Sequence, residues 1–166
     1  SFPTRRSSDL DYLAFARGDS GEVAQPTDMA MALEELRSDA ERHGHTATVA
    51  FHGLPVVTVK PASFKRCLAN LVSNAARHAN TISITGQRDH RYLNITIDDD
   101  GPGIPADMRE EVFKPFLRLD DARNQDEGGS GLGLAIARDI ARSHGGDILL
   151  SESPMGGLRA AVRVPV

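Results

Sequence analysis

The sequence is poor in the features that mark several large classes of protein. Its only cysteine among 166 residues is Cys67, which excludes an internal disulfide framework, argues against a cysteine-based zinc site and fits a reducing compartment. No apolar run approaches roughly 18 residues, so these residues contain neither a membrane span nor a secretory signal. Positive charge is not in excess either: 19 basic and 23 acidic residues give a formal net charge of −4, which argues against a polycationic nucleic-acid binder.

The length indicates one folded domain that follows a short N-terminal segment, since about 150 residues is an ordinary domain length. Residues 1–10 have no amphipathic period, and we expect a non-native or disordered tail there. Residues 11–17 (DYLAFAR) fit the last two turns of a helix stopped by Gly18, followed by a polar linker. The sequence therefore predicts a helix end and linker over 11–21 and one domain over 22–166.

Hydrophobic periodicity predicts helices that alternate with pairs of strands. Thr27 or Asp28 can cap the first helix, Gly44 can end it, and Pro61 can open the second. The expected helices cover residues 28–43, 61–79, 106–113 and 132–144, and the expected strands cover residues 46–53, 54–59, 81–85, 93–97 and 158–164. This order predicts a two-layer α/β sandwich, with one mixed sheet and helices on one face.

The expected helix at 61–79 has a polar stripe beside its apolar one. The apolar stripe recurs with helical spacing and consists of Phe64, Cys67, Leu68, Leu71, Val72 and Ala75. Asn70, Asn74 and Arg77 fall on the neighbouring stripe, followed by His78. Asparagine oxygens suit a magnesium ion that takes its other ligands from phosphate and water, and Arg77 can neutralise phosphate charge. The alternative is a solvated polar face without a ligand.

Asp98, Asp99 and Asp100 precede a glycine-rich turn, in the segment DDDGPG. Glycine at 101 and 103 permits positive φ and leaves room for a flat ligand against the main chain. A carboxylate before such a turn can accept a hydrogen bond from the exocyclic amine of adenine and disfavours guanine, which presents a carbonyl there. An acidic β-turn without a ligand is the other interpretation.

A second glycine cluster, GGSGLGL at 128–134, runs directly into the last expected helix. Its backbone amides and the helix N-terminus can hold phosphates, although a plain hinge has the same composition. It is not a Walker A loop, because no lysine followed by Ser or Thr comes after the glycines, and position 134 breaks the dinucleotide-binding fingerprint. The polar residues 117–130 before it are either a solvated loop or a lid whose Arg118 or Arg123 could reach a triphosphate.

In this order the segments resemble the catalytic ATP-binding domain of sensor histidine kinases, within the family called GHKL. NLVSNAARHAN resembles its N box, DDDGPGI its first glycine box, EVFKPFLR its F box and GGSGLGLAIARDIARSHGG its second glycine box. The residues of these motifs resemble those of the EnvZ-like osmosensor branch of the family. The resemblance implies the Bergerat ATP-binding fold, with ATP and Mg²⁺ held under a lid.

The resemblance also implies roles for single residues. It assigns magnesium coordination to Asn70 and Asn74 and phosphate contact to Arg77. It assigns adenine recognition to Asp99, beside a wall of Gly101 and Gly103. The other residues it places around the nucleotide or its lid are His78, Phe113, Phe116, Arg118, Arg123, Gly129, Ser130, Gly131, Leu132 and Gly133. The expected catalytic residues are Asn70, Arg77 and Arg118.

Two departures from the family pattern refine the expected reaction. Hydrolytic members have a glutamate at the position of Asn70 to activate water, whereas the helix here has no carboxylate. An amide cannot act as a general base, and phosphoryl transfer to a neutral imidazole needs none, so the sequence favours a kinase over an ATPase. None of the six histidines has the context of a phosphate acceptor, and we therefore expect the acceptor helix outside this sequence.

The expected function is transfer of the γ-phosphate of Mg-ATP to a histidine on a dimerisation domain of the same kinase. The resemblance implies a response-regulator receiver domain as the next partner, a homodimeric parent, no nucleic-acid partner, a cytoplasmic location for this domain and a parent in the bacterial inner membrane. Two alternatives remain open at this point. One is a GHKL protein serine kinase of the anti-sigma type, and the other is a non-catalytic ATP-binding sensor.

Overall fold

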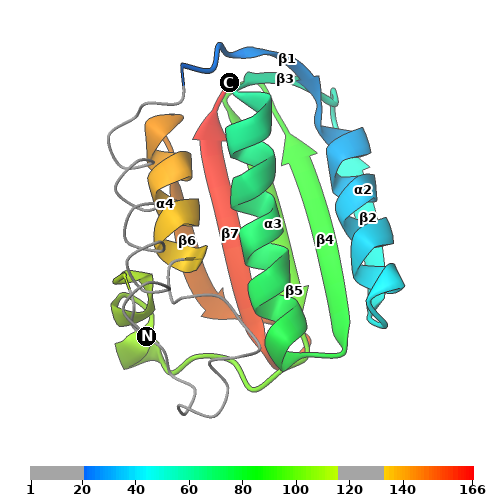
Figure 1. The fold of residues 1–166 in the computed structure, drawn as a ribbon, viewed down its shortest axis with the longest axis vertical. Coiled ribbons are helices and arrows are strands. Elements are labelled where there is room, and N and C mark those ends of the chain that lie inside the picture. The colour runs from blue at the N-terminus through cyan, green and yellow to red at the C-terminus, as the bar shows by residue number, and fades with distance from the viewer. Residues whose placement is uncertain (1–20, 116–132) are drawn as a thin grey trace, which may run out of the picture.

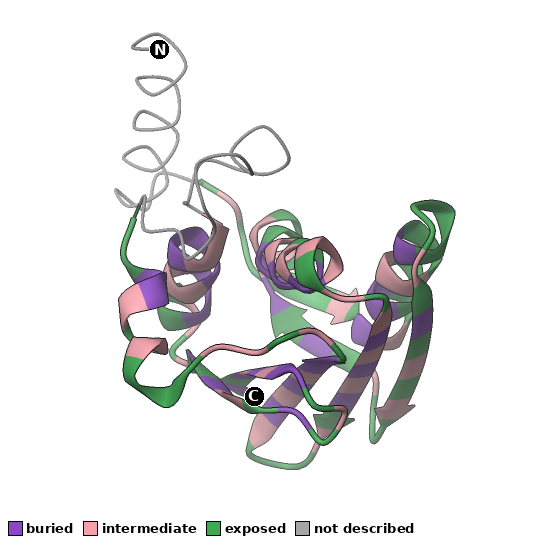
Figure 2. Cartoon of the chain, turned by 90° about the horizontal axis from the view of Figure 1, so that it is seen from below, coloured by how far each residue is buried: buried purple, intermediate pink, exposed green. Residues whose placement is uncertain are grey.

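Three helices lie on one face of a five-stranded sheet in the computed structural model, which describes residues 21–115 and 133–166 (Figure 1). In chain order the elements are β1 (Gln25–Asp28), α2 (Met29–Arg42), β2 (Thr46–His52), β3 (Val56–Val59), α3 (Pro61–His78), β4 (Thr81–Arg88), β5 (Tyr92–Asp99), the 3₁₀ turns η1 (Ala106–Met108) and η2 (Glu111–Phe113), α4 (Gly133–Ser143), β6 (Asp147–Glu152) and β7 (Leu158–Pro165). Viewed from below, helices and strands form two layers with the buried residues between them (Figure 2).

The five-stranded sheet is mixed, as the sequence predicts. Its order is β2-β4-β5-β7-β6; β2 and β4 run parallel, and every other neighbouring pair is antiparallel. Alternate residues of the central strands face the helices, as Ile84 and its register partner Ile97 do. A separate two-stranded pair, β1 with β3, lies across the top of the view in Figure 1. The expected two-layer α/β sandwich is therefore confirmed.

Helix α3 is the centre of the core, and its buried residues are the six of the expected apolar stripe. It runs antiparallel to α4 (Figure 1) and is bonded to it in two places. The Cys67 thiol donates to the carbonyl of Ala137 at 3.3 Å, and the Asn70 side chain donates to the carbonyl of Gly133 at 3.2 Å. Burial raises the pKa of Cys67 to about 12, so the thiol stays protonated and its role is packing.

The structure corrects the expected elements in three places. The expected helix over 106–113 is two separate 3₁₀ turns, η1 and η2, each of three residues. Strand β1 is not predicted because its sequence, QPTD, has no apolar alternation and it pairs with β3 through backbone groups. Strand β6 is also missed, because Ile148, Leu149 and Leu150 are all apolar, so the sequence does not show the alternation of buried and exposed positions.

The other expected elements are confirmed within one to three residues where they are described. The Asp28 side chain caps α2 by accepting from the amide of Met31 at 3.0 Å. Residue 132, the expected first residue of the last helix, lies outside the described residues, as do residues 1–20. In the parts of the chain that are described, no helix is long and apolar enough to cross a membrane.

Candidate functional site

The three aspartates at the end of β5 have three different surroundings. Because side chains alternate between the two faces of a strand, Asp98 lies on the face of the sheet opposite to the helices. Its carboxylate accepts two hydrogen bonds from Arg159, at 2.8 and 3.1 Å. Asp100 accepts from the backbone amides of Asn80 and Thr81, both at 3.0 Å, and these bonds lower the pKa of the Asp100 carboxyl. Asp99 alone lies on the helix side of the strand, and it is 4% exposed.

The Asp99 carboxylate is held by backbone amides through one of its oxygens. Oδ1 accepts from Gly101 at 2.9 Å and from Leu158 at 3.0 Å, and the backbone carbonyl of Asp99 accepts from Gly157 at 3.1 Å. Oδ2 accepts no hydrogen bond from residues in the described part of the chain. The fixed carboxylate can accept a hydrogen bond from an N–H donor of a ligand through Oδ2.

Glycines allow the three backbone segments around Asp99 to meet. A Cβ at Gly157 would lie 2.2 Å from Asp99 Oδ1, and one at Gly101 would lie 2.7 Å from the carbonyl oxygen of His78. Gly103 uses the freedom that glycine gives, with a φ of +76°, whereas Gly101 does not have a positive φ. Gly101 is required for close approach to the end of α3, and the strand end, α3 and β7 therefore meet at one place.

Gly157 is the site residue that sequence reasoning missed. Its sequence signal is a Gly-Gly pair between two strands, which is also what an ordinary turn contains. Its contact with Asp99 joins residues 58 positions apart along the chain, and the pairing of β5 with β7 brings them together. Figure 1 shows this junction at the lower end of the sheet, below the C-terminus of α3.

The polar stripe of α3 faces the same end of the molecule. Asn70, Asn74 and Arg77 are each partly buried, and His78, the last residue of the helix, is exposed. The bond from Asn70 Nδ2 to Gly133 fixes the amide so that Oδ1 is available to a ligand. It also places the polar stripe beside the first residue of α4, the last glycine of the second glycine cluster.

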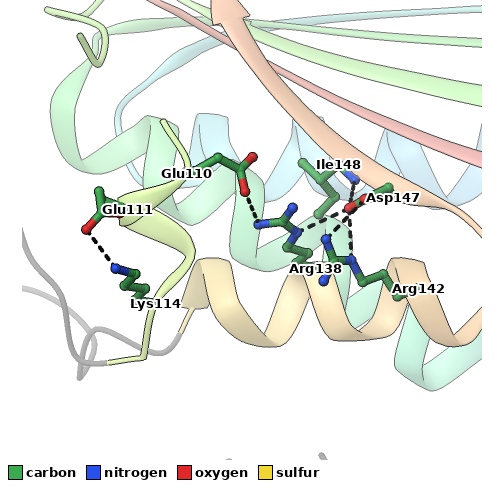
Figure 3. Close-up of polar contacts among 7 residues, drawn as sticks. All are labelled: Glu110, Glu111, Lys114, Arg138, Arg142, Asp147 and Ile148. Atoms are coloured by element: carbon green, nitrogen blue, oxygen red, sulfur yellow. Dashed lines mark hydrogen bonds and ion pairs between the residues drawn. The ribbon is translucent and has the colours of Figure 1, made fainter. Parts of the chain in front are cut away.

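Arg138 of α4 holds the 3₁₀ turns in place, and the sequence does not single it out. Its guanidinium lies 4.4 Å from the centroid of the buried Phe113 ring, and it donates to Glu110 at 3.0 Å and to Asp147 at 3.3 Å (Figure 3). A shallow hollow of about 330 Å³ lies along this outer side of α4, lined by Glu110, Glu111, Phe113, Lys114, Pro115, Ala135, Arg138, Asp139 and Arg142. Asp99 and Asn70 are not part of that hollow, and its lining mixes charges of both signs, so we place the site at Asp99.

Some of the expected site residues lie outside the described residues: Phe116, Arg118, Arg123, Gly129, Ser130, Gly131 and Leu132. Those described are Asn70, Asn74, Arg77, His78, Asp99, Gly101, Gly103, Phe113 and Gly133. The structure brings Asp99, Gly101 and His78 together, and it brings Asn70 to Gly133. No group of three or more His, Cys, Asp or Glu side chains that could form a metal cage occurs within 21–115 and 133–166.

Sequence comparison identifies relatives of this arrangement. Residues 59–166 match the model of the family described as "Histidine kinase-, DNA gyrase B-, and HSP90-like ATPase". The chain is 38% identical over 136 residues to the sensor histidine kinase CpxA of Escherichia coli, covering 81% of this chain and 30% of CpxA. It is 35% identical over 164 residues to the probable sensor histidine kinase TcrY of Mycobacterium tuberculosis, covering 94% and 34%. The chain thus spans about a third of these relatives.

Solved structures share the fold. The ATP-binding domain of PrrB from Mycobacterium tuberculosis superposes with a TM-score of 0.73 at 27% identity, covering 87% of this chain and 98% of that one. The histidine kinase domain of the Escherichia coli osmosensor EnvZ gives a TM-score of 0.66 at 34% identity, covering 87% and 89%.

The crowding at Gly157 predicts a position-specific loss of stability. We expect Gly157→Ala to lower the free energy of unfolding by about 1–3 kcal/mol, because the new methyl group overlaps the Asp99 carboxylate. Denaturant unfolding measures this. Gly133→Ala is the matched control, since a Cβ there meets nothing within 4 Å among the described residues, and its stability should stay within about 0.5 kcal/mol of the parent. Equal stability of the two variants would contradict the packing around Asp99.

Proposed function

Because the chain belongs to the histidine kinase-, DNA gyrase B- and HSP90-like ATPase family, we propose that it binds Mg-ATP and passes the γ-phosphate to a histidine of a dimerisation domain. The relatives named sensor histidine kinases support this reaction. The observation that carries the proposal is the buried carboxylate of Asp99, which is fixed by two backbone amides through Oδ1. The transfer itself belongs to the longer protein, of which this chain supplies the nucleotide-binding part.

Asp99 recognises the adenine base in this proposal. Oδ2 accepts the exocyclic amine, while the bonds to Gly101 and Leu158 hold the carboxylate in its rotamer. Guanine would place its carbonyl oxygen against the Asp99 carboxylate, and both groups are hydrogen-bond acceptors. The site therefore prefers ATP to GTP. Gly101, Gly103 and Gly157 let the main chain pack closely around Asp99, and in this proposal the flat base lies on the Oδ2 side of the carboxylate.

The polar stripe of α3 binds the phosphates and their magnesium ion in this proposal. Asn70 and Asn74 offer amide oxygens to magnesium, whose remaining ligands come from phosphate and water. Bound magnesium neutralises charge on the phosphate oxygens. Arg77 on the same helix adds a permanent positive charge next to them. The Asn70 side chain fits this role because the bond to Gly133 uses its nitrogen and not its oxygen.

The residues of α3 fit transfer to nitrogen better than hydrolysis. Its sequence contains no carboxylate that could take a proton from water. A neutral imidazole attacks phosphorus with its own lone pair, so an N–P bond forms as the bond to the leaving ADP oxygen breaks, and ADP departs with that electron pair. Positioning and charge neutralisation are then the contribution of this domain. The proposed catalytic residues are Asn70, Arg77 and Arg118.

The proposed partners follow from the same reaction. The phosphohistidine passes its phosphoryl group to an aspartate of a response-regulator receiver domain, and the parent dimerises through the domain that carries the histidine. We place this domain in the cytoplasm and the parent in the bacterial inner membrane, in keeping with sensor kinases as relatives.

A single substitution tests adenine recognition. Asp99→Asn keeps an Oδ1 for the amides of Gly101 and Leu158 but turns Oδ2 into a donor that faces the adenine amine. We expect ATP to bind about 100-fold more weakly or worse, measured by calorimetry, and the preference for ATP over GTP to fall. Asp100→Asn is the control, because an asparagine there still accepts from Asn80 and Thr81. An ATP affinity within threefold of the parent would refute the adenine assignment.

Metal dependence tests the asparagines. Asn74→Ala should remove most of the gain in ATP affinity that magnesium gives over EDTA, because one metal ligand is lost. Ser73→Ala, an exposed neighbour on α3, should leave that gain intact. If Asn74→Ala responds to magnesium like the parent, Asn74 is not a ligand.

The transfer step needs a reconstituted pair. Mixing the chain with a separately made dimerisation fragment and γ-labelled ATP should label the fragment with an acid-labile, base-stable phosphohistidine. The fragment with its acceptor histidine replaced by alanine is the control. An unlabelled fragment in the presence of normal ATP binding would overturn the transfer. An acid-stable phosphoserine would point instead to a serine kinase.

A further inference from the structure

The N-terminus of α3 lacks a cap from its own residues. The N-cap residue Lys60 makes no side-chain capping bond, and the first turn contains no acidic residue. The first amides of a helix have no partner inside the helix, so a partly buried helix end needs acceptors from elsewhere. In α3 the amides in question are those of Lys60, Ala62 and Ser63.

Two distant side chains supply the acceptors. The Glu22 carboxylate accepts from the Ala62 amide at 2.6 Å through Oε2, and from the Ser63 amide at 3.0 Å and hydroxyl at 2.9 Å through Oε1. His144, just after α4, accepts from the Lys60 amide at 3.1 Å through Nε2. The cap of α3 is therefore assembled from the segment that enters the domain and from the end of another helix.

The hydrogen bonds that the first turn of α3 donates to Glu22 are strong because the acceptor is a charged carboxylate. A negative charge at a helix N-terminus interacts favourably with the helix dipole, and charge-assisted bonds to amides add to this. Desolvation alone would raise the pKa of Glu22, but the bonds from Ala62 and Ser63 and the nearby His144 lower it below the ordinary value. The carboxylate is thus charged at neutral pH.

Glu22 lies at the end of α3 opposite to Asp99. Helix α3 has 18 residues, which makes it about 27 Å long, and Figure 1 shows its N-terminus at the upper end of the molecule and its C-terminus above the Asp99 junction. Asn70, Asn74 and Arg77 lie between the two ends. A shift of the capped end would therefore move the polar stripe relative to Asp99, which is fixed in the sheet.

We propose that Glu22 is a positioning residue that couples the chain entering this domain to nucleotide binding on α3. A force on the segment before β1 would break the cap and weaken the binding of nucleotide without contact between Glu22 and the ligand. The coupling rests on the proposed function of α3 as the phosphate-binding helix.

The test compares Glu22→Ala and Glu22→Gln with a matched control, Glu35→Gln, in the 166-residue chain. Glu35 is an exposed carboxylate that pairs with Lys65 of α3 at 3.9 Å but caps nothing. We expect Glu22→Ala to weaken the affinity for Mg-ATP three- to tenfold, Glu22→Gln to weaken it less because an acceptor oxygen remains, and Glu35→Gln to leave it unchanged.

A second readout separates coupling from a merely structural role. Coupling between two sites is reciprocal, so Mg-ATP should slow hydrogen exchange of the Ala62 and Ser63 amides in the parent by a similar factor, and not in Glu22→Ala. Unchanged exchange on addition of Mg-ATP, or an unchanged affinity in Glu22→Ala, would overturn the coupling. Failure of the parent to bind Mg-ATP at all would overturn the proposed function, and the coupling with it.

Discussion

A carboxylate buried at the end of a strand needs hydrogen-bond donors for its charge, and at Asp99 the backbone supplies them. Its Oδ1 takes the amides of Gly101 and Leu158, so β7 must begin where β5 ends. That closeness leaves no room for a side chain at Gly157. The closeness of the end of β5 to the start of β7 and the glycines at 101 and 157 thus accompany one buried charge.

Helix α3 connects this charge with the rest of the domain. Two hydrogen bonds join it to α4, Asn70 with Gly133 and Cys67 with Ala137, and a third joins the residues next to the two helices, Lys60 with His144. The edge of the His144 ring packs on Phe64, with the ring centroids 5.2 Å apart. The two helices therefore act as one body above the sheet, and the polar stripe of α3 has a fixed relation to the start of α4.

Much of this architecture is predictable from local sequence, because apolar periodicity and caps act over a few residues. The stripe from Phe64 to Ala75 and the alternation of Leu93, Ile95 and Ile97 give the correct helix face and strand face. The positions of Asp99 and Asn70 follow from the same patterns. What could not be predicted are contacts between distant residues: Gly157 against Asp99, and Glu22 on the first turn of α3. Strand β1 could not be predicted for a related reason, since its pairing with β3 uses backbone groups and leaves no pattern in the side chains.

The borrowed cap of α3 also bears on where this module begins. The family model starts at residue 59, whereas the hydrogen bonds of its first helix reach back to Glu22. A fragment cut where the family model starts would separate α3 from the Glu22 carboxylate and from α2. The hydrogen bonds of α3 thus extend beyond the residues that the family model matches, and Glu22 outside that range holds the first turn of the helix.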